Sequence, residues 1–201
     1  LNLYDTQLGK VTAATKVSMR DIVVQPFNDG YLIVGYDDDG VNAYLCSADF
    51  SKKEDLKLYG LLAEDFILSP YGVDISKDGK TLAIAGFRGL YLYDVKSRKL
   101  STLISDEDNA KNNNIKISTI EQLCFINQDT ELAFVGLGTE LPEVSNADNV
   151  HIYGTISIDG GKLTITKPAS YTVAELLVGG DMLMMPQGFD RNNGTLLVMD
   201  T

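Results

Sequence analysis

One short apolar segment recurs along this chain at nearly constant spacing. It reads YLIVG from Tyr31, TLAIAG from Thr81 and ELAFVG from Glu131, starts that are 50 residues apart, and TLLVMD follows from Thr195. Asn, Asp or Gly precedes each copy, as in hairpin turns that lead into a strand. A chain with this regularity is built from repeated β units, and each unit must bury its apolar faces against its neighbours.

A second segment, which carries a tyrosine near its end, accompanies the first. It follows the first three copies and also opens the chain, as VNAYL (41–45), LYLYD (90–94), VHIYG (150–154) and LNLYD (1–5). This alignment predicts one equivalent position for Tyr4, Tyr44, Tyr93 and Tyr153. With an apolar strand before each turn and a shorter one after each tyrosine strand, a unit has four strands, which we call a to d. Four strands in about 50 residues is the size of a propeller blade.

The sequence therefore predicts an all-β chain, a β-propeller of four-stranded antiparallel blades with four repeats in a single domain, 1–201. Because the chain starts at a strand c and stops after a strand b, its two ends together recreate one b–c hairpin. Two arrangements fit, a closed four-bladed ring and a part of a larger propeller. Residues 173–185 are ambiguous between a helical turn and a strand. The expected blades are 20–62, 70–105, 118–168, and 185–201 joined with 1–17.

The blade pattern resembles that of bacterial propellers of the WD-repeat-like and YVTN/lactonase-like kinds. Residues 71–99 show an apolar strand, a DGK turn, a strand, and a strand ending in Tyr-Asp, and residues 185–200 resemble the repeat phrase of NHL-like propellers. The resemblance implies a propeller and a bacterial source, and we expect a secreted or cell-surface location rather than a cytoplasmic one. It leaves the activity open because this scaffold hosts many functions. Gln187 stands where the phrase often has Glu or Asn, so no metal site is carried over.

Charge and residue content exclude several classes of function. The formal net charge of −11 argues against a nucleic-acid binder, which needs a basic surface, and against docking on an anionic membrane. His151 is the only histidine, which rules out any multi-histidine metal site, and its position between apolar residues of a predicted strand favours a structural role over a place in a catalytic triad. We expect it on the strand face opposite Val150 and Ile152. Cys46 and Cys124 lie in separate predicted strands and should be reduced.

The favoured function is that of a non-enzymatic binding or scaffold protein that presents an acidic loop face to a protein, peptide or glycan. In up-and-down blades the b–c and d–a loops share one face, and both marked insertions, 138–149 and 105–118, are loops of these two kinds. The candidate binding residues on this face are Asp37, Asp38, Asp39, Arg88, Asp106, Glu107, Asp108, Glu140, Glu143 and Asp148.

The alternative is a lactonase-like hydrolase or lyase with carboxylates, or a divalent cation, near the central channel. No cofactor is expected. Ca²⁺ is the one cation considered, because Asp37–Asp39 offer three adjacent carboxylates, although they lack the spaced oxygens of an EF-hand loop. A third alternative is a structural piece of a larger extracellular protein. Strand a supplies the channel candidates, which are Asp21, Asp74, Glu121 and Asp190.

Overall fold

The computed structural model describes residues 1–58, 72–86, 89–105, 115–140, 150–166, 177–179, 182–187 and 195–200, and from Thr166 onward the description covers the backbone. All regular elements in these ranges are β-strands, seventeen of them, against the roughly sixteen that four repeats of four strands predict. Within the described residues there is no helix long and apolar enough to span a membrane. The predicted all-β class is confirmed.

Three four-stranded antiparallel sheets form the centre of the molecule, each in the up-and-down order that the repeat predicts. Sheet 1 contains β3 (Arg20–Phe27), β4 (Gly30–Asp37), β5 (Gly40–Ser47) and β6 (Lys53–Asp55). Sheet 2 contains β7 (Val73–Ile75), β8 (Thr81–Gly86), β9 (Gly89–Asp94) and β10 (Lys99–Ser105). Sheet 3 contains β11 (Ile115–Ile126), β12 (Glu131–Glu140), β13 (Val150–Ser157) and β14 (Leu163–Thr166).

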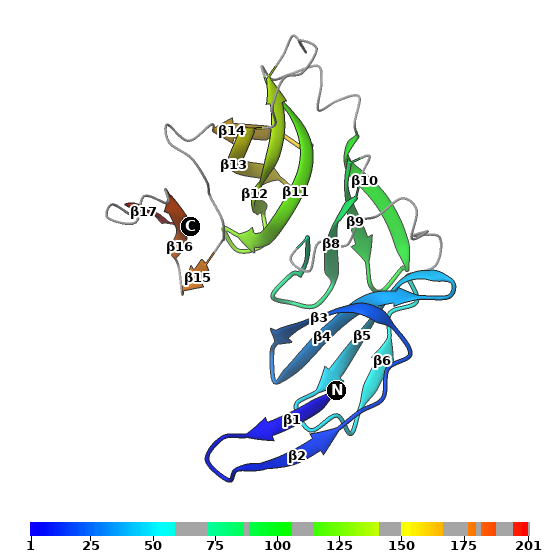
Figure 1. Ribbon diagram of the computed structural model, residues 1–201. Coiled ribbons are helices and arrows are strands. Elements are labelled where there is room, and N and C mark those ends of the chain that lie inside the picture. The colour runs from blue at the N-terminus through cyan, green and yellow to red at the C-terminus, as the bar shows by residue number, and fades with distance from the viewer. Residues whose placement is uncertain are drawn as a thin grey trace.

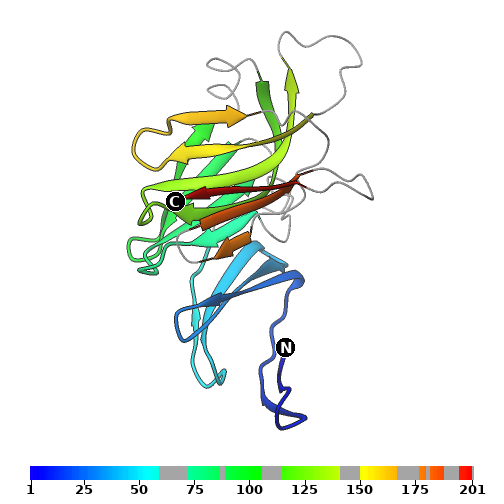
Figure 2. The same cartoon turned by 90° about the vertical axis from the view of Figure 1, so that its left-hand side faces the viewer.

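Two smaller sheets lie at the ends of the chain. A hairpin of β1 (Asn2–Asp5) and β2 (Lys10–Ala14) precedes sheet 1, and a three-stranded sheet of β15 (Leu177–Gly179), β16 (Met182–Gln187) and β17 (Thr195–Asp200) follows sheet 3. β15 falls in the stretch that the sequence left ambiguous, and it is a strand. The sheets follow one another along an open arc, with the first hairpin and the last sheet at its two ends (Figures 1 and 2).

The two seams between the central sheets hold the core. Between sheets 1 and 2 the buried side chains include Leu32, Val34, Val73, Leu82, Ile84 and Tyr93. Between sheets 2 and 3 they include Ala83, Ala85, Leu90, Leu132, Phe134 and Ile152. Neighbouring residues of β8 thus enter opposite seams, because successive side chains of a strand point to opposite faces. This explains why β8 is a continuous apolar run rather than an alternating one.

The repeat alignment misplaces the faces of sheet 1. It equates Leu32 with Leu82, yet these two residues pack together in the same seam, so Leu32 points forward to sheet 2 and Leu82 points back to sheet 1. The a–b connection of sheet 1 closes on the pair Phe27–Gly30, whereas in sheet 2 the Ser76 N–H donates to Thr81 O across a longer turn. The hydrogen-bonded pairs of sheet 1 are therefore displaced by one residue, and such a displacement moves every side chain to the other face.

The prediction that the four tyrosines occupy one equivalent position is also wrong. Tyr93 pairs with Leu82 and is buried against sheet 1, whereas Tyr153 pairs with Val135, on the face of sheet 3 opposite to the buried Ile152. Tyr153 therefore points away from the preceding sheet and Tyr93 toward it. The long β12–β13 connection leaves the register of the two tyrosine segments independent of their spacing in the sequence.

The two insertions are partly strand. β11 already begins at Ile115 and pairs with β12 as far as Glu140, so residues 115–118 and 138–140, expected as loop, extend the β11–β12 ladder. Ile115 and Ile117 are partly buried against the core between sheets 2 and 3, and this burial stabilises the strand conformation there. The remaining parts of both insertions lie outside the described residues.

Within the described residues, the two end segments of the chain do not pair with each other. β1 pairs with β2 and β17 pairs with β16, and among the described strands β1 and β17 have no ladder in common. Both views place the first hairpin and the β15–β17 sheet apart (Figures 1 and 2). The three central sheets, fixed by two apolar seams, stand between them. The prediction of free cysteines is confirmed, since Cys46 and Cys124 are both buried thiols.

Candidate functional site

One edge of the central sheets gathers acidic residues. Because the strands alternate in direction, the β4–β5 and β12–β13 connections emerge at the edge where the first strand of each sheet begins. Four of the predicted binding residues lie at this edge within the described ranges, and we call them the acidic edge: Asp37, Asp38, Asp39 and Glu140.

Asp37 holds the β4–β5 turn together. One of its carboxylate oxygens accepts a hydrogen bond from the Asp39 N–H at 2.9 Å, and the other accepts one from the Asn42 side-chain amide at 3.1 Å. Gly40, with φ of 131°, completes the turn in a region that a side chain would disfavour. Asp37 is thus committed to the turn, as Asp residues often are when they bond their own backbone two residues on.

Asp38 and Asp39 have no such structural task. Both are exposed at the tip of the turn, and in the part of the chain that the structure describes their carboxylates make no hydrogen bond or ion pair. The ion pair found among the described residues, Lys80 with Asp78, lies on an a–b turn at the opposite edge. Two charges therefore remain available to a partner at this tip.

Of the remaining predicted binding residues, only Glu140 lies within the described ranges. Glu140 ends β12 and is exposed opposite Ile115. No group of three His, Cys, Asp or Glu side chains within the described ranges could hold a metal ion. Asp37 is held in the turn by its hydrogen bonds, whereas Asp38 and Asp39 are exposed at the tip. Six predicted residues lie outside the described ranges: Arg88, Asp106, Glu107, Asp108, Glu143 and Asp148.

The channel candidates do not lie at equivalent positions along the first strand of each sheet. Asp21 is exposed with φ of 49°, and Glu121 is half-buried; both lie at register shifts toward the acidic-edge end of β3 and β11. Asp74 is the middle residue of β7, near the a–b turn at the other end. Asp190 lies outside the described residues. The three described carboxylates therefore differ in depth along the strands.

Asp74 points sideways into the seam between sheets 2 and 3. Its Oδ2 accepts a hydrogen bond from the Phe125 N–H of β11 at 2.7 Å, and its Oδ1 accepts one from the Ile75 N–H at 2.8 Å. Burial raises the pKa of Asp74 to about 6, although these two hydrogen bonds act to lower it and the charge of Asp129 adds to the rise. Both carboxylate oxygens accept hydrogen bonds from backbone N–H groups, and the bond from Phe125 connects sheet 2 to sheet 3.

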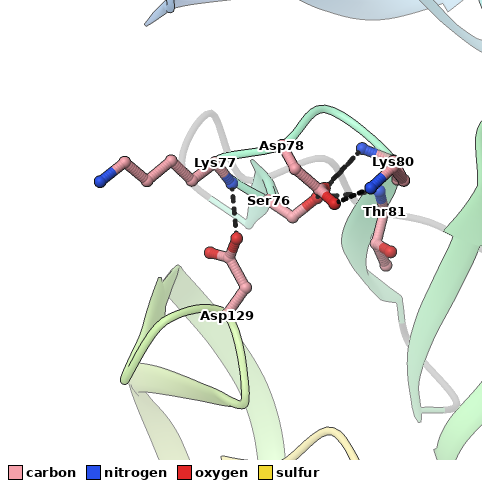
Figure 3. Close-up of polar contacts among 6 residues, drawn as sticks. All are labelled: Ser76, Lys77, Asp78, Lys80, Thr81 and Asp129. Atoms are coloured by element: carbon pink, nitrogen blue, oxygen red, sulfur yellow. Dashed lines mark hydrogen bonds and ion pairs between the residues drawn. The ribbon is translucent and has the colours of Figure 1, made fainter.

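A second carboxylate crosses the same seam in the opposite direction. Asp129, on the β11–β12 turn of sheet 3, accepts a hydrogen bond from the Lys77 N–H of sheet 2 at 2.9 Å (Figure 3). Beside it the β7–β8 turn is closed by Ser76, whose hydroxyl donates to Asp78 at 2.9 Å and accepts from the Thr81 N–H at 2.9 Å (Figure 3). Hydrogen bonds from Lys80 and Ser76 lower the pKa of Asp78 to about 2.

The seam of sheets 1 and 2 has its own polar ties. The Gln25 amide donates to Val73 O at 2.7 Å, and the Tyr93 hydroxyl donates to Leu56 O at 2.7 Å. Sequence reasoning missed the hydrogen bond made by Gln25 because it considered acidic residues alone for strand a. A polar residue beside the a–b turn of an otherwise apolar strand, as Gln25 and Asp74 both are, was the available signal.

Cys124 and His151 fit structural positions. Cys124 is the residue of β11 that precedes Phe125, and burial together with the nearby Asp74 charge raises its pKa to about 12, which makes it a poor nucleophile. His151 is half-buried on β13 opposite Leu137, on the face away from Ile152, as predicted. Its Nδ1 is buried and has no hydrogen-bond partner among the described residues.

Comparisons with known proteins identify the fold. No protein-family model and no curated protein matches the sequence. Among solved structures, an oligogalacturonate lyase from Vibrio parahaemolyticus matches 96% of this chain and 53% of its own, with a TM-score of 0.56 and 13% identity. The tricorn protease matches 94% of this chain and 17% of its own, with a TM-score of 0.57 and 11% identity.

This chain thus spans about half of the lyase and a smaller part of the protease. At sequence identities this low, structural similarity indicates a shared fold but does not indicate a shared activity. The blade-like sheets, their up-and-down order and these structural matches together confirm the predicted architecture: the chain folds as an all-β protein of the β-propeller kind.

Proposed function

We propose that this protein is a non-enzymatic binding propeller whose acidic edge takes a lysine- or arginine-rich segment of a protein or peptide partner. The observation that carries the proposal is the tip of the β4–β5 turn, where the exposed carboxylates of Asp38 and Asp39 make no hydrogen bond or ion pair with a described residue. Asp37 and Gly40 hold the tip in place. A net charge of −11 favours the approach of a cationic partner from a distance.

The strand-a carboxylates support the binding role over the enzymatic one. Asp74 has the raised pKa that marks many catalytic acids, but both of its oxygens accept backbone hydrogen bonds inside a seam. Asp21 and Glu121 lie at a different level of the strands. The one perturbed carboxylate of this set is thus explained by packing between sheets.

The test is a titration of a fluorescent lysine-rich peptide into the 201-residue chain, at low and at high salt. We expect salt-sensitive binding that the double variant Asp38→Asn/Asp39→Asn weakens by about 5- to 30-fold, since an exposed charge contact contributes up to ~1 kcal/mol. The matched control is Asp29→Asn/Asp159→Asn, which removes two exposed charges from turns at the opposite edge and should change the affinity less than about twofold.

Equal weakening by both double variants would show attraction to the net charge alone and would contradict a site at the acidic edge. Absence of peptide binding would contradict the proposal as well. Binding of neutral oligosaccharides instead, insensitive to salt, would replace the cationic partner with a glycan.

A further inference from the structure

The last strand of sheet 2 presents a long outer edge. β10 has seven residues, compared with three in β6 and four described residues in β14, the strands that occupy the same place in sheets 1 and 3. Among the described strands β10 pairs with β9 alone. Its first four residues, Lys99, Leu100, Ser101 and Thr102, are all exposed, so both faces of this half of the strand are open to solvent.

The backbone of β10 directs polar groups to this outer edge. The Arg98 N–H donates to Asp94 O at 2.8 Å across the β9–β10 turn, so the backbone of Asp94 points to β10. Because backbone groups in an antiparallel ladder alternate between the two edges of a strand, Lys99, which lies opposite Asp94, faces β9. Leu100 and Thr102 therefore direct their N–H and C=O groups outward, where no described strand pairs with them.

Sheet 3 closes the far end of this edge. The register between β10 and β9 shifts directly after Thr102. A Cβ atom added at Gly161, on the β13–β14 turn, would lie 2.5 Å from Leu103 O, so this turn packs closely against β10 at Leu103. The part of β10 that a further strand could join is therefore the segment 99–102, which we call the open edge.

Three cations lie beside the open edge. Lys96, Arg98 and Lys99 are exposed on the β9–β10 turn and at the start of β10, and none of them forms an ion pair with a described residue. The carboxylate of Asp94 accepts a hydrogen bond from the Ser97 N–H and is thus held in the turn. In a chain with a net charge of −11 this cationic cluster is a local exception. It complements an acidic segment, whereas a second copy of the chain would bring the same cations to the edge.

We propose that the open edge is a second binding site, at which an extended segment of a protein partner, rich in glutamate or aspartate, adds a strand to sheet 2 beside β10. An unpaired strand edge is a template for such an addition: backbone hydrogen bonds supply affinity, and the neighbouring side chains select the partner. Leu100, 38% exposed, offers an apolar contact to the added strand. This site differs in position and in charge from the acidic edge and does not depend on it.

The first test titrates a fluorescent peptide of alternating valine and glutamate into the 201-residue chain. Leu100→Pro removes an outward N–H and obstructs the added strand but keeps the pairing of β10 with β9, so it should weaken binding at least about tenfold. The matched control Leu100→Ala retains that N–H and should weaken binding less than about threefold. Circular dichroism checks that both variants are folded.

The contribution of charge is tested with the same peptide at low salt. Lys96→Gln/Lys99→Gln removes two of the three cations and should weaken binding about 3- to 10-fold. The control Lys10→Gln/Lys52→Gln removes two exposed charges elsewhere on the chain and should change the affinity less than about twofold. Equal weakening by the two double variants would show attraction without a site and would overturn the proposal.

Hydrogen exchange of backbone amides gives a measurement that needs no variant. The Leu100 and Thr102 amides should exchange rapidly in the free chain and become protected when the peptide is present. Absence of peptide binding overturns the proposal, as does binding that Leu100→Pro leaves unchanged or protection confined to other amides. Protection of these two amides that grows with protein concentration in the absence of peptide would show that β10 pairs with a second copy, and would overturn the acidic partner.

Discussion

Gln25, Asp74 and Tyr93 are single side chains that connect whole sheets. Each reaches a backbone group of the neighbouring sheet or of the chain segment beside it, at Val73 O, at the Phe125 N–H and at Leu56 O. Apolar contacts are not directional, whereas a hydrogen bond to one backbone atom is satisfied in one register. These three residues therefore select the relative position of sheets that the apolar contacts merely hold together.

Tyr93→Phe tests this role at the residue scale. The variant leaves the buried carbonyl of Leu56 without its donor, and we expect a loss of about 1–3 kcal/mol in the free energy of unfolding, measured by urea denaturation. Tyr4→Phe is the matched control, since the Tyr4 hydroxyl is exposed and has no partner among the described residues; it should change stability by less than about 0.5 kcal/mol. Equal losses in the two variants would contradict a specific role for the Tyr93 hydroxyl.

At the scale of elements, strand alternation and turn chemistry were readable from the sequence, and register was not. The DGK turn with Ser76 and Asp78, and the boundaries of β8 and β17, follow from local residue patterns that predict strands and turns. The faces of sheet 1 depend on which pair closes the Phe27–Gly30 turn, a one-residue difference that apolar content does not reveal. The same limit made Tyr93 and Tyr153 look equivalent.

For the candidate site, the sequence indicated the acidic β4–β5 turn but did not show which of its aspartates is structural and which are exposed. That Asp37 closes the turn while Asp38 and Asp39 are exposed depends on hydrogen bonds that three adjacent aspartates do not specify. Asp74 was singled out as a channel residue, and its orientation into the seam depends on how sheet 3 packs against sheet 2.

The seam between sheets 2 and 3 should respond to pH through Asp74. The pKa of Asp74 is about 6 in the folded protein, compared with the ordinary value of 3.8 that applies to the unfolded chain. As the pH falls, the folded protein therefore binds a proton at Asp74 before the unfolded chain does. Stability from this group therefore rises on acidification, by about 1 kcal/mol between about pH 7 and about pH 5. Asp78 and Asp49, whose pKa values are lowered to about 2, lose their stabilising effect only at lower pH.

Urea denaturation across this interval, above the isoelectric point near 4.4, measures the slope. Asp74→Asn cannot titrate, so its stability should lack that rise, whatever its absolute value. A variant whose pH dependence equals that of the unaltered chain would show that Asp74 is not the group responsible.

On the scale of the whole molecule, the described residues form an arc of packed β-sheets with a charged edge (Figure 1). The sheets bury each other through two apolar seams, as repeat architectures require, because one sheet cannot cover both of its faces. At the tip of the β4–β5 turn the exposed carboxylates of Asp38 and Asp39 make no hydrogen bond or ion pair with a described residue. These two adjacent charges at one tip are the basis of the proposed binding function.

The most direct measurement is nuclear magnetic resonance mapping of backbone amide signals during titration with the lysine-rich peptide. The account predicts the largest shifts in the β4–β5 turn, at Asp38, Asp39 and Gly40, with the a–b and c–d turns at Lys77 and Asp159 little affected. Shifts concentrated at Lys77 and Asp159, or spread evenly over both edges, would contradict a binding site at the acidic edge.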